Sequence, residues 1–184
     1  MQIVSMSKTI AIIPARGGSK RIPEKNIQIF GGLPLMVHSI LYAQKNSDII
    51  DDIYVSTDND EIKIIALQYG AKVIDRPASL SGDLEPTITA LIHALEYIDN
   101  DEIENIILLQ PTNPLRPENL LKETFSLYQN ENLDSLFTVS RNYQKLHVDH
   151  RFDHQLYIQN ELHQMILSMF LRHQNQNLLN FHPL

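Results

Sequence analysis

The chain has 184 residues and a formal net charge of −7, and its 43% hydrophobic and 20% charged residues are typical of one globular domain. This charge excludes attraction of the whole surface to nucleic acid or to an anionic membrane. The sequence has no cysteine, which excludes disulfides and thiolate chemistry and leads us to expect a cytoplasmic protein. No apolar run approaches the roughly 20 residues that a membrane-spanning helix needs.

Short segments rich in β-branched residues alternate with amphipathic segments along the chain. The former predict strands at 9–14, 52–58, 71–75, 105–110 and 135–140. The latter predict helices at 33–46, 85–98 and 116–129, and a further helix that begins at the turn 58–60 and runs through residue 68. This alternation predicts an α/β fold, a doubly wound and mostly parallel sheet with helices on both faces. Ligands of such sheets bind outside the carboxyl ends of the strands, so the loops that follow the strands are where we expect a site.

Turn and cap residues mark the ends of these elements. Pro34 suits the first turn of the helix at 33–46. Residues 58–60 offer capping side chains for the helix that ends at residue 68, and Asp58 is interpreted as an N-cap, with a metal ligand as the alternative. Gly70 lies where a left-handed residue ends that helix.

The segment "IAIIPARGGSKRIPEKN", residues 10–26, carries the strongest chemical signal. Small glycines let backbone N–H groups approach a bound anion. Arg16 can hold a phosphate through two hydrogen bonds, and Lys25 adds a mobile point charge. The spacing fits neither GxxxxGK[ST] nor GxGxxG. The residues therefore predict a triphosphate site of another kind, and a solvated basic loop is the alternative.

Four segments resemble, in order and spacing, the motifs of the CMP-sugar-acid synthetases, or acylneuraminate cytidylyltransferases, which include the legionaminate and pseudaminate enzymes. They are "IPARGGSKRIPEKNI", "YVSTDNDEI", "GAKVIDRPASLSGD" and "LLQPTNPLR". The resemblance covers roughly residues 9–140. It implies a Rossmann-like nucleotidyltransferase of the nucleotide-diphospho-sugar transferase type. Such an enzyme transfers CMP from CTP to the anomeric hydroxyl of a nine-carbon 2-keto sugar acid and releases pyrophosphate.

The resemblance also implies roles for individual residues. Arg16 and Lys25 are expected to be catalytic, at the phosphates of CTP. Nucleotide binding is expected of Ala15, Gly17, Gly18, Asn26, Arg76 and Thr87. Sugar-acid binding is expected of Gln110, Thr112 and Lys145. For Arg76 a plain Arg-Pro turn is the alternative, and Arg116 is expected to brace the turn that contains Gln110 and Thr112.

The last part of the chain differs in composition and is rich in histidine. One more amphipathic helix is predicted at 160–173. The histidines of 147–154 are interpreted as surface residues in preference to a metal site. Met165, Met169 and Phe170 are interpreted as packing residues, and the resemblance suggests that this region forms a homodimer interface.

The sequence divides into a cytidylyltransferase core at 1–140 and a partial sugar-acid and dimerisation region at 141–184. Members of the family are usually longer and carry a pair of aspartates that holds Mg²⁺, which is absent here, so the chain resembles a truncated member. Mg²⁺ is then expected to be held mainly by the triphosphate, and the metal ligands of the chain are unknown. Two alternatives stay open. One is a nucleotidyltransferase for another base or sugar, and the other is a non-catalytic CTP-binding remnant.

Overall fold

The computed structural model describes residues 8–19, 22–82, 85–140 and 165–172. In these residues one large sheet has the strand order β5-β4-β1-β6-β8-β7. Its strands are β1 (Lys8–Pro14), β4 (Asp52–Thr57), β5 (Lys72–Asp75), β6 (Ile103–Leu108), β7 (Ser135–Ser140) and β8 (Met165–Arg172). The helices are α1 (Val37–Lys45), α2 (Asp60–Gln68), α3 (Thr87–Ile98) and α4 (Leu120–Asn130). None of these helices has the length and apolarity that spanning a bilayer requires.

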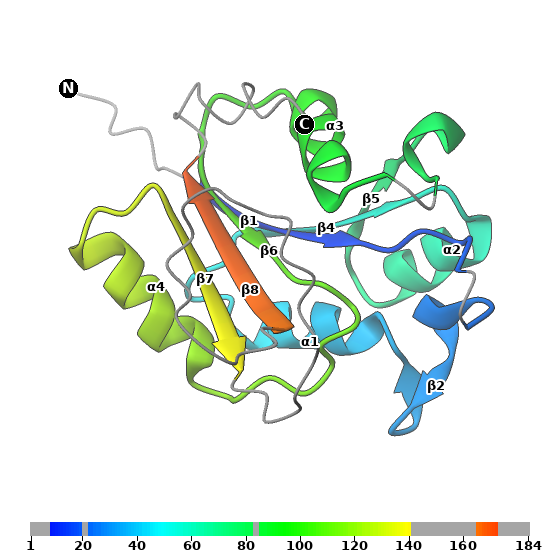
Figure 1. The fold of residues 1–184 in the computed structure, drawn as a ribbon, viewed down its shortest axis with the longest axis horizontal. Helices are drawn as coiled ribbons and strands as arrows, with labels where there is room; N and C mark the ends of the chain where they lie inside the picture. Colours follow the sequence, from blue (N-terminus) through cyan, green and yellow to red (C-terminus); the bar gives the residue numbers. More distant parts are fainter. Residues whose placement is uncertain (1–7, 20–21, 83–84, 141–164, 173–184) are drawn as a thin grey trace, which may run out of the picture.

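The sheet is mostly parallel, as the alternation of elements predicts. β1 pairs in parallel with β4 and β6, and β4 pairs in parallel with β5. β8 is antiparallel to both of its neighbours, β6 and β7 (Figure 1). The helix predicted at 160–173 is therefore wrong, because residues 165–172 form a strand. Pairing with two open strand edges outweighs local helical preference in a short, almost wholly apolar segment.

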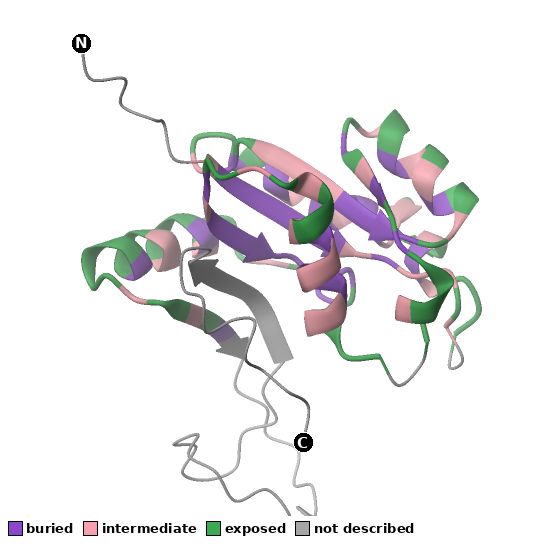
Figure 2. Cartoon of the chain, turned by 90° about the horizontal axis from the view of Figure 1, so that it is seen from above, coloured by how far each residue is buried: buried purple, intermediate pink, exposed green. Residues whose placement is uncertain are grey.

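Both faces of the sheet are covered, which makes the fold doubly wound. Along β1, Ile10 and Ile12 pack on the α3 side, together with Leu91 and Ala94 of that helix. Ala11 and Ile13 belong to the opposite cluster, which includes buried residues of α1, α2 and α4. Figure 2 shows the buried residues along the strands and the inner sides of the helices. An apolar strand without alternation is what burial on both faces requires.

The N-terminal end of the helix predicted at 33–46 is wrong, because Leu33 and Pro34 form the strand β3 (Leu33–Pro34). This strand pairs with β2 (Ile29–Phe30) in a two-residue hairpin. The turn residues Gly31 and Gly32 have φ of +57° and +88°. Two consecutive positive φ angles suit a tight hairpin turn and favour glycine at both positions.

The ends of α2 show which cap residues act. Asn59, not Asp58, is its N-cap, since the Asn59 side chain accepts a hydrogen bond from the Ile62 N–H. The N-cap predicted at Asp58 is wrong. Gly70 follows the helix with φ of +79°, as predicted. The N–H of Ala71 and that of Gly70 donate to carbonyl groups of the last turn, which closes the helix in a Schellman motif.

The remaining predicted helices and strands are confirmed with shifted ends. α3 begins two residues later than predicted, directly after Pro86. α4 begins at Leu120 rather than at residue 116, and the segment before it is irregular. β6 ends at Leu108, so Gln110 lies in the loop beyond the strand. The division of the chain at residue 140 stays a prediction, and β8 joins the same sheet as β1.

Candidate functional site

A cleft of about 220 Å³ opens at the carboxyl ends of the parallel strands, beside the start of α3. It brings together most of the predicted site residues, namely Arg16, Lys25, Asn26, Arg76, Thr87, Gln110 and Thr112. The rest of its described lining consists of Pro14, Leu80, Gly82, Glu85, Pro86, Ala90 and Pro111. The predicted residues Ala15, Gly17 and Gly18 lie in the adjoining loop, and Lys145 lies outside the described residues. The roles of all these predicted site residues stay predictions.

Arg16 follows β1 and reaches across the cleft to the loop that precedes α3. Its Nη1 donates to the carbonyl oxygen of Gly82 at 2.7 Å and to that of Ser81 at 3.3 Å. Carbonyl oxygens carry only partial charge, so an incoming phosphate is a stronger acceptor for this guanidinium group. The arrangement places the cation at the rim of the cleft, within reach of a bound anion.

Ala15 and Asn26 fix the backbone on either side of Arg16. Ala15 is buried, and its N–H donates to the Ser56 carbonyl at 2.9 Å, which extends the pairing of β1 with β4 by one residue. Asn26 is also buried, and its Nδ2 donates to the Arg16 carbonyl at 2.8 Å. Lys25 precedes it in a short 3₁₀ helix, Lys25–Ile27, and lines the cleft. Asn26 thus shapes the loop that carries Arg16.

The two glycines of the loop differ in their surroundings. The Gly17 N–H donates to Oδ1 of Asp58 at 2.9 Å. A Cβ at Gly17 would lie 2.7 Å from the Cβ of Asn59, a contact too close for any side chain. At Gly18 a Cβ would have no atom of the described residues within 4 Å. Gly17 is therefore required by close packing against the turn before α2, whereas Gly18 faces open space.

Arg76 is a buried cation at the base of the cleft, with 8% of its surface exposed. Its Nη2 donates to the Ser56 carbonyl, and its backbone N–H donates to the Thr57 carbonyl at 2.8 Å. Burial lowers the pKa of Arg76, the nearby Asp58 carboxylate raises it, and the nearby Arg16 guanidinium lowers it. Two guanidinium groups that repel each other across one cleft favour an anion between them.

Gln110, Thr112 and Arg116 belong to one turn after β6. Arg116 donates from Nη2 to the Gln110 carbonyl at 2.7 Å and from Nη1 to Oγ of Ser39 at 3.1 Å. Its guanidinium lies over the ring of Tyr42, 5.5 Å from the centroid. Burial lowers the pKa of Arg116 to about 10. Arg116 braces the turn, as expected from the sequence, and holds Gln110 at the wall of the cleft.

A larger hollow of about 400 Å³ lies elsewhere, between α1 and the start of α4. Its lining includes Lys45, Arg116 and Lys122 and contains none of the residues predicted to bind nucleotide or sugar acid. Position decides between the two hollows, because the smaller one lies at the carboxyl ends of the strands, where ligands of doubly wound sheets bind. The smaller cleft is therefore the candidate site.

Sequence reasoning missed two residues that support this site. Asp58 binds the loop at Gly17 instead of capping α2, and Asn59 packs beneath the same glycine. Their position directly after β4, at the carboxyl edge of the sheet, is the signal that could have placed them beside the loop.

The fold is similar to the folds of two solved enzymes. It superposes on CMP:2-keto-3-deoxy-manno-octonic acid synthetase complexed with CTP with a TM-score of 0.60 and 23% identity, covering 70% of this chain and 51% of that one. It also superposes on a 4-diphosphocytidyl-2C-methyl-D-erythritol synthase with a TM-score of 0.62 and 14% identity. This match covers 90% of this chain and 75% of that one. The chain itself belongs to the cytidylyltransferase family, whose model matches residues 10–178.

Curated relatives agree with this assignment. The chain is 40% identical over 136 residues to the pseudaminic acid cytidylyltransferase of Campylobacter jejuni, covering 72% of this chain and 58% of that protein. It is 35% identical over 125 residues to the CMP-N,N'-diacetyllegionaminic acid synthase of Legionella pneumophila, covering 66% of this chain and 53% of that protein. It is 38% identical over 136 residues to the N-acylneuraminate cytidylyltransferase of Streptococcus agalactiae, covering 72% of this chain and 32% of that protein. The match thus spans about half, or less, of the length of these relatives.

Proposed function

We propose that the chain carries the CTP-binding and acceptor-binding core of a cytidylyltransferase that acts on a nonulosonic acid of the sialic acid type. One observation carries the proposal. A single cleft is lined by the three cations Arg16, Lys25 and Arg76 and by the uncharged polar residues Gln110 and Thr112. The relatives named above, which act on pseudaminic, legionaminic and acylneuraminic acids, supply the substrate class.

In the proposed reaction the anomeric hydroxyl of the sugar acid attacks the α-phosphorus of CTP, and pyrophosphate leaves. Phosphoryl transfer of this kind depends on positioning and charge neutralisation more than on covalent help. Arg16 and Lys25 neutralise the phosphates, and Arg76 holds the nucleotide at the base of the cleft. Gln110 offers both a donor and an acceptor to a polyhydroxylated acid, and its backbone is held by Arg116.

The proposal further includes Mg²⁺ as the cofactor, a homodimer as the assembly and the cytoplasm as the location. Among the described residues no three metal-binding side chains lie together, and Glu85 is the one acid in the described lining of the cleft. These residues do not by themselves fit a magnesium site, so we assign Mg²⁺ to the oxygens of the triphosphate, where it would neutralise charge. The assignment to the cytoplasm relies on the cysteine-free sequence.

The test is pyrophosphate release from CTP with Mg²⁺, measured against a panel of nine-carbon 2-keto sugar acids. Release that requires one acid of the panel, and that Arg16→Ala abolishes, is expected. Lys45→Ala is the matched control, because this lysine lies outside the cleft at the end of α1. Folded protein that binds CTP but releases no pyrophosphate with any acid would contradict catalysis by this chain. Absence of CTP binding would contradict the proposal as a whole.

A further inference from the structure

The stem of the loop at 15–19 is held by residues from two other parts of the chain. Asn26 donates to the Arg16 carbonyl at 2.8 Å, and the Gly17 N–H donates to Asp58 Oδ1 at 2.9 Å. Asn59 fills the space beneath Gly17. Gly18, which follows, has no such neighbour among the residues that the structure describes. The loop therefore has a fixed stem at Arg16 and Gly17 and an open tip.

Asp58 has no other structural task that the described residues reveal. Asn59 caps α2, and the two carboxylates that pair with Lys63 are those of Asp60 and Asp75. The Asp58 side chain is exposed, yet it is near enough to raise the pKa of the buried Arg76. Asp58 thus binds the loop that carries Arg16 and acts on Arg76, and both of these cations line the cleft.

We propose that Asp58 is a positioning residue that fixes the stem of the loop in the free protein and thereby sets the affinity for the triphosphate. The inference rests on the proposed function, since it takes CTP as the ligand of the cleft. A loop that is already ordered loses less conformational entropy when the nucleotide binds. If Asp58 is removed, the binding-competent fraction falls and the apparent dissociation constant rises in proportion.

An opposite role for the same carboxylate makes the inference testable. An anion close to Arg76 could compete with phosphate for the cations of the cleft, and its removal would then strengthen CTP binding. Positioning predicts weaker binding instead. Asp58→Ala removes both the charge and the acceptor, whereas Asp58→Asn removes the charge and keeps an oxygen that can accept the Gly17 N–H. The pair of variants therefore separates the two roles.

The first measurement needs no nucleotide. Amide hydrogen exchange at Gly17, followed by NMR in the full chain, reports whether the stem is held. We expect Asp58→Ala to accelerate exchange at Gly17 by about tenfold or more, because a hydrogen bond to a charged acceptor is lost. Asp60→Asn is the matched control, because Asp60 is an exposed acid of the same turn whose carboxylate contacts Lys63. Unchanged exchange at Gly17 in Asp58→Ala would overturn the inference.

The second measurement is calorimetric titration with CTP. We expect the dissociation constant to rise by about tenfold in Asp58→Ala, to stay within about threefold of the unmodified protein in Asp58→Asn, and to be unchanged in Asp60→Asn. Tighter binding by both Asp58 variants would show competition and overturn positioning. If the unmodified protein binds no CTP, the proposed function fails, while the exchange measurement still decides whether Asp58 fixes the loop.

Discussion

The two segments that border the cleft are held in different ways. The turn at 110–116 is braced by its own Arg116, which binds the Gln110 carbonyl within the same segment. The loop at 15–19 depends on Asn26, Asp58 and Asn59, which lie outside it. The segment proposed to meet the sugar acid is thus held by a residue of its own, which is in turn anchored at Ser39 and Tyr42 of α1. The segment proposed to meet the phosphates is held by residues of other segments, among them the turn between β4 and α2.

Replacement of the internal brace is expected to have the largest effect. Arg116→Met leaves the partly buried Gln110 carbonyl and the buried Ser39 Oγ without this donor and should lower the free energy of unfolding by about 3 kcal/mol. Urea denaturation measures the change. Lys122→Met is the control, since it removes a half-exposed cation beside the same hollow. A loss below about 1 kcal/mol for Arg116→Met would show that the turn has other support.

The second effect tests the external support of the loop. Gly17→Ala forces a Cβ against Asn59, and overpacking of this kind costs about 2 kcal/mol or shifts the loop. Gly18→Ala has open space and should leave stability within about 0.5 kcal/mol. Thermal unfolding of both variants, together with CTP titration, measures the contrast. Equal behaviour of the two variants would contradict the distinction between a packed stem and an open tip.

The sequence predicted those features that depend on local patterns. Apolar runs placed the parallel strands, and residues directly beyond them, such as Arg16 and Gln110, were expected at one edge of the sheet. Contacts between distant segments were not predictable in this way. Asp58 binds a residue 41 positions away, and residues 165–172 form a strand because two other strands offer their edges. Lys145, the boundary at 140 and the dimer stay predictions.

A smaller effect is expected from the helix cap that underlies the loop. Asn59→Ala removes the acceptor of the Ile62 N–H and should cost about 1 kcal/mol. Asn119 is the matched control, because it is the N-cap residue of α4 and its side chain makes no capping hydrogen bond. Thermal unfolding should therefore show a clear loss for Asn59→Ala and almost none for Asn119→Ala. Equal losses would mean that the cap does not support the turn beside the loop.

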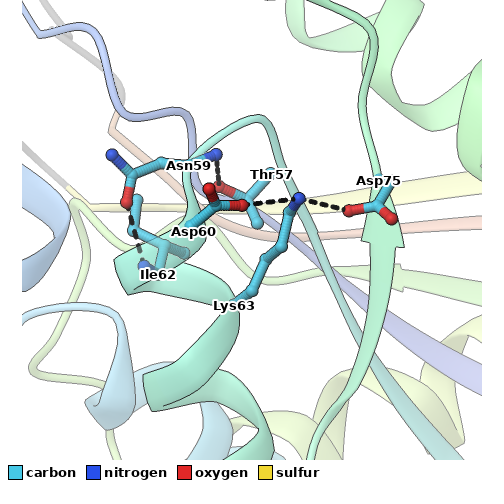
Figure 3. A network of polar contacts seen from close by, with 6 residues as sticks. All are labelled: Thr57, Asn59, Asp60, Ile62, Lys63 and Asp75. Carbon is cyan, nitrogen blue, oxygen red and sulfur yellow. Dashed lines mark hydrogen bonds and ion pairs between the residues drawn. The ribbon is translucent and has the colours of Figure 1, made fainter.

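The smallest effect is expected from the ion pairs that surround the same turn. Figure 3 shows Lys63 of α2 between Asp60 and Asp75. Lys63 Nζ lies 3.0 Å from Oδ1 of Asp60 and 2.7 Å from Oδ1 of Asp75. Asp75 and Asp60 raise the pKa of Lys63 above its ordinary value of 10.5, so any stability from these pairs is fully present below that value and is lost as the pH rises through the raised pKa. Because the pairs are exposed to solvent, Lys63→Met should leave the melting temperature at neutral pH almost unchanged. At low salt, where screening is weaker, the melting temperature should fall somewhat more. A loss at neutral pH as large as that of Asn59→Ala would contradict this ranking. It would mean that the charges around α2, and not the cap and the close packing at Gly17, hold the turn on which the loop depends.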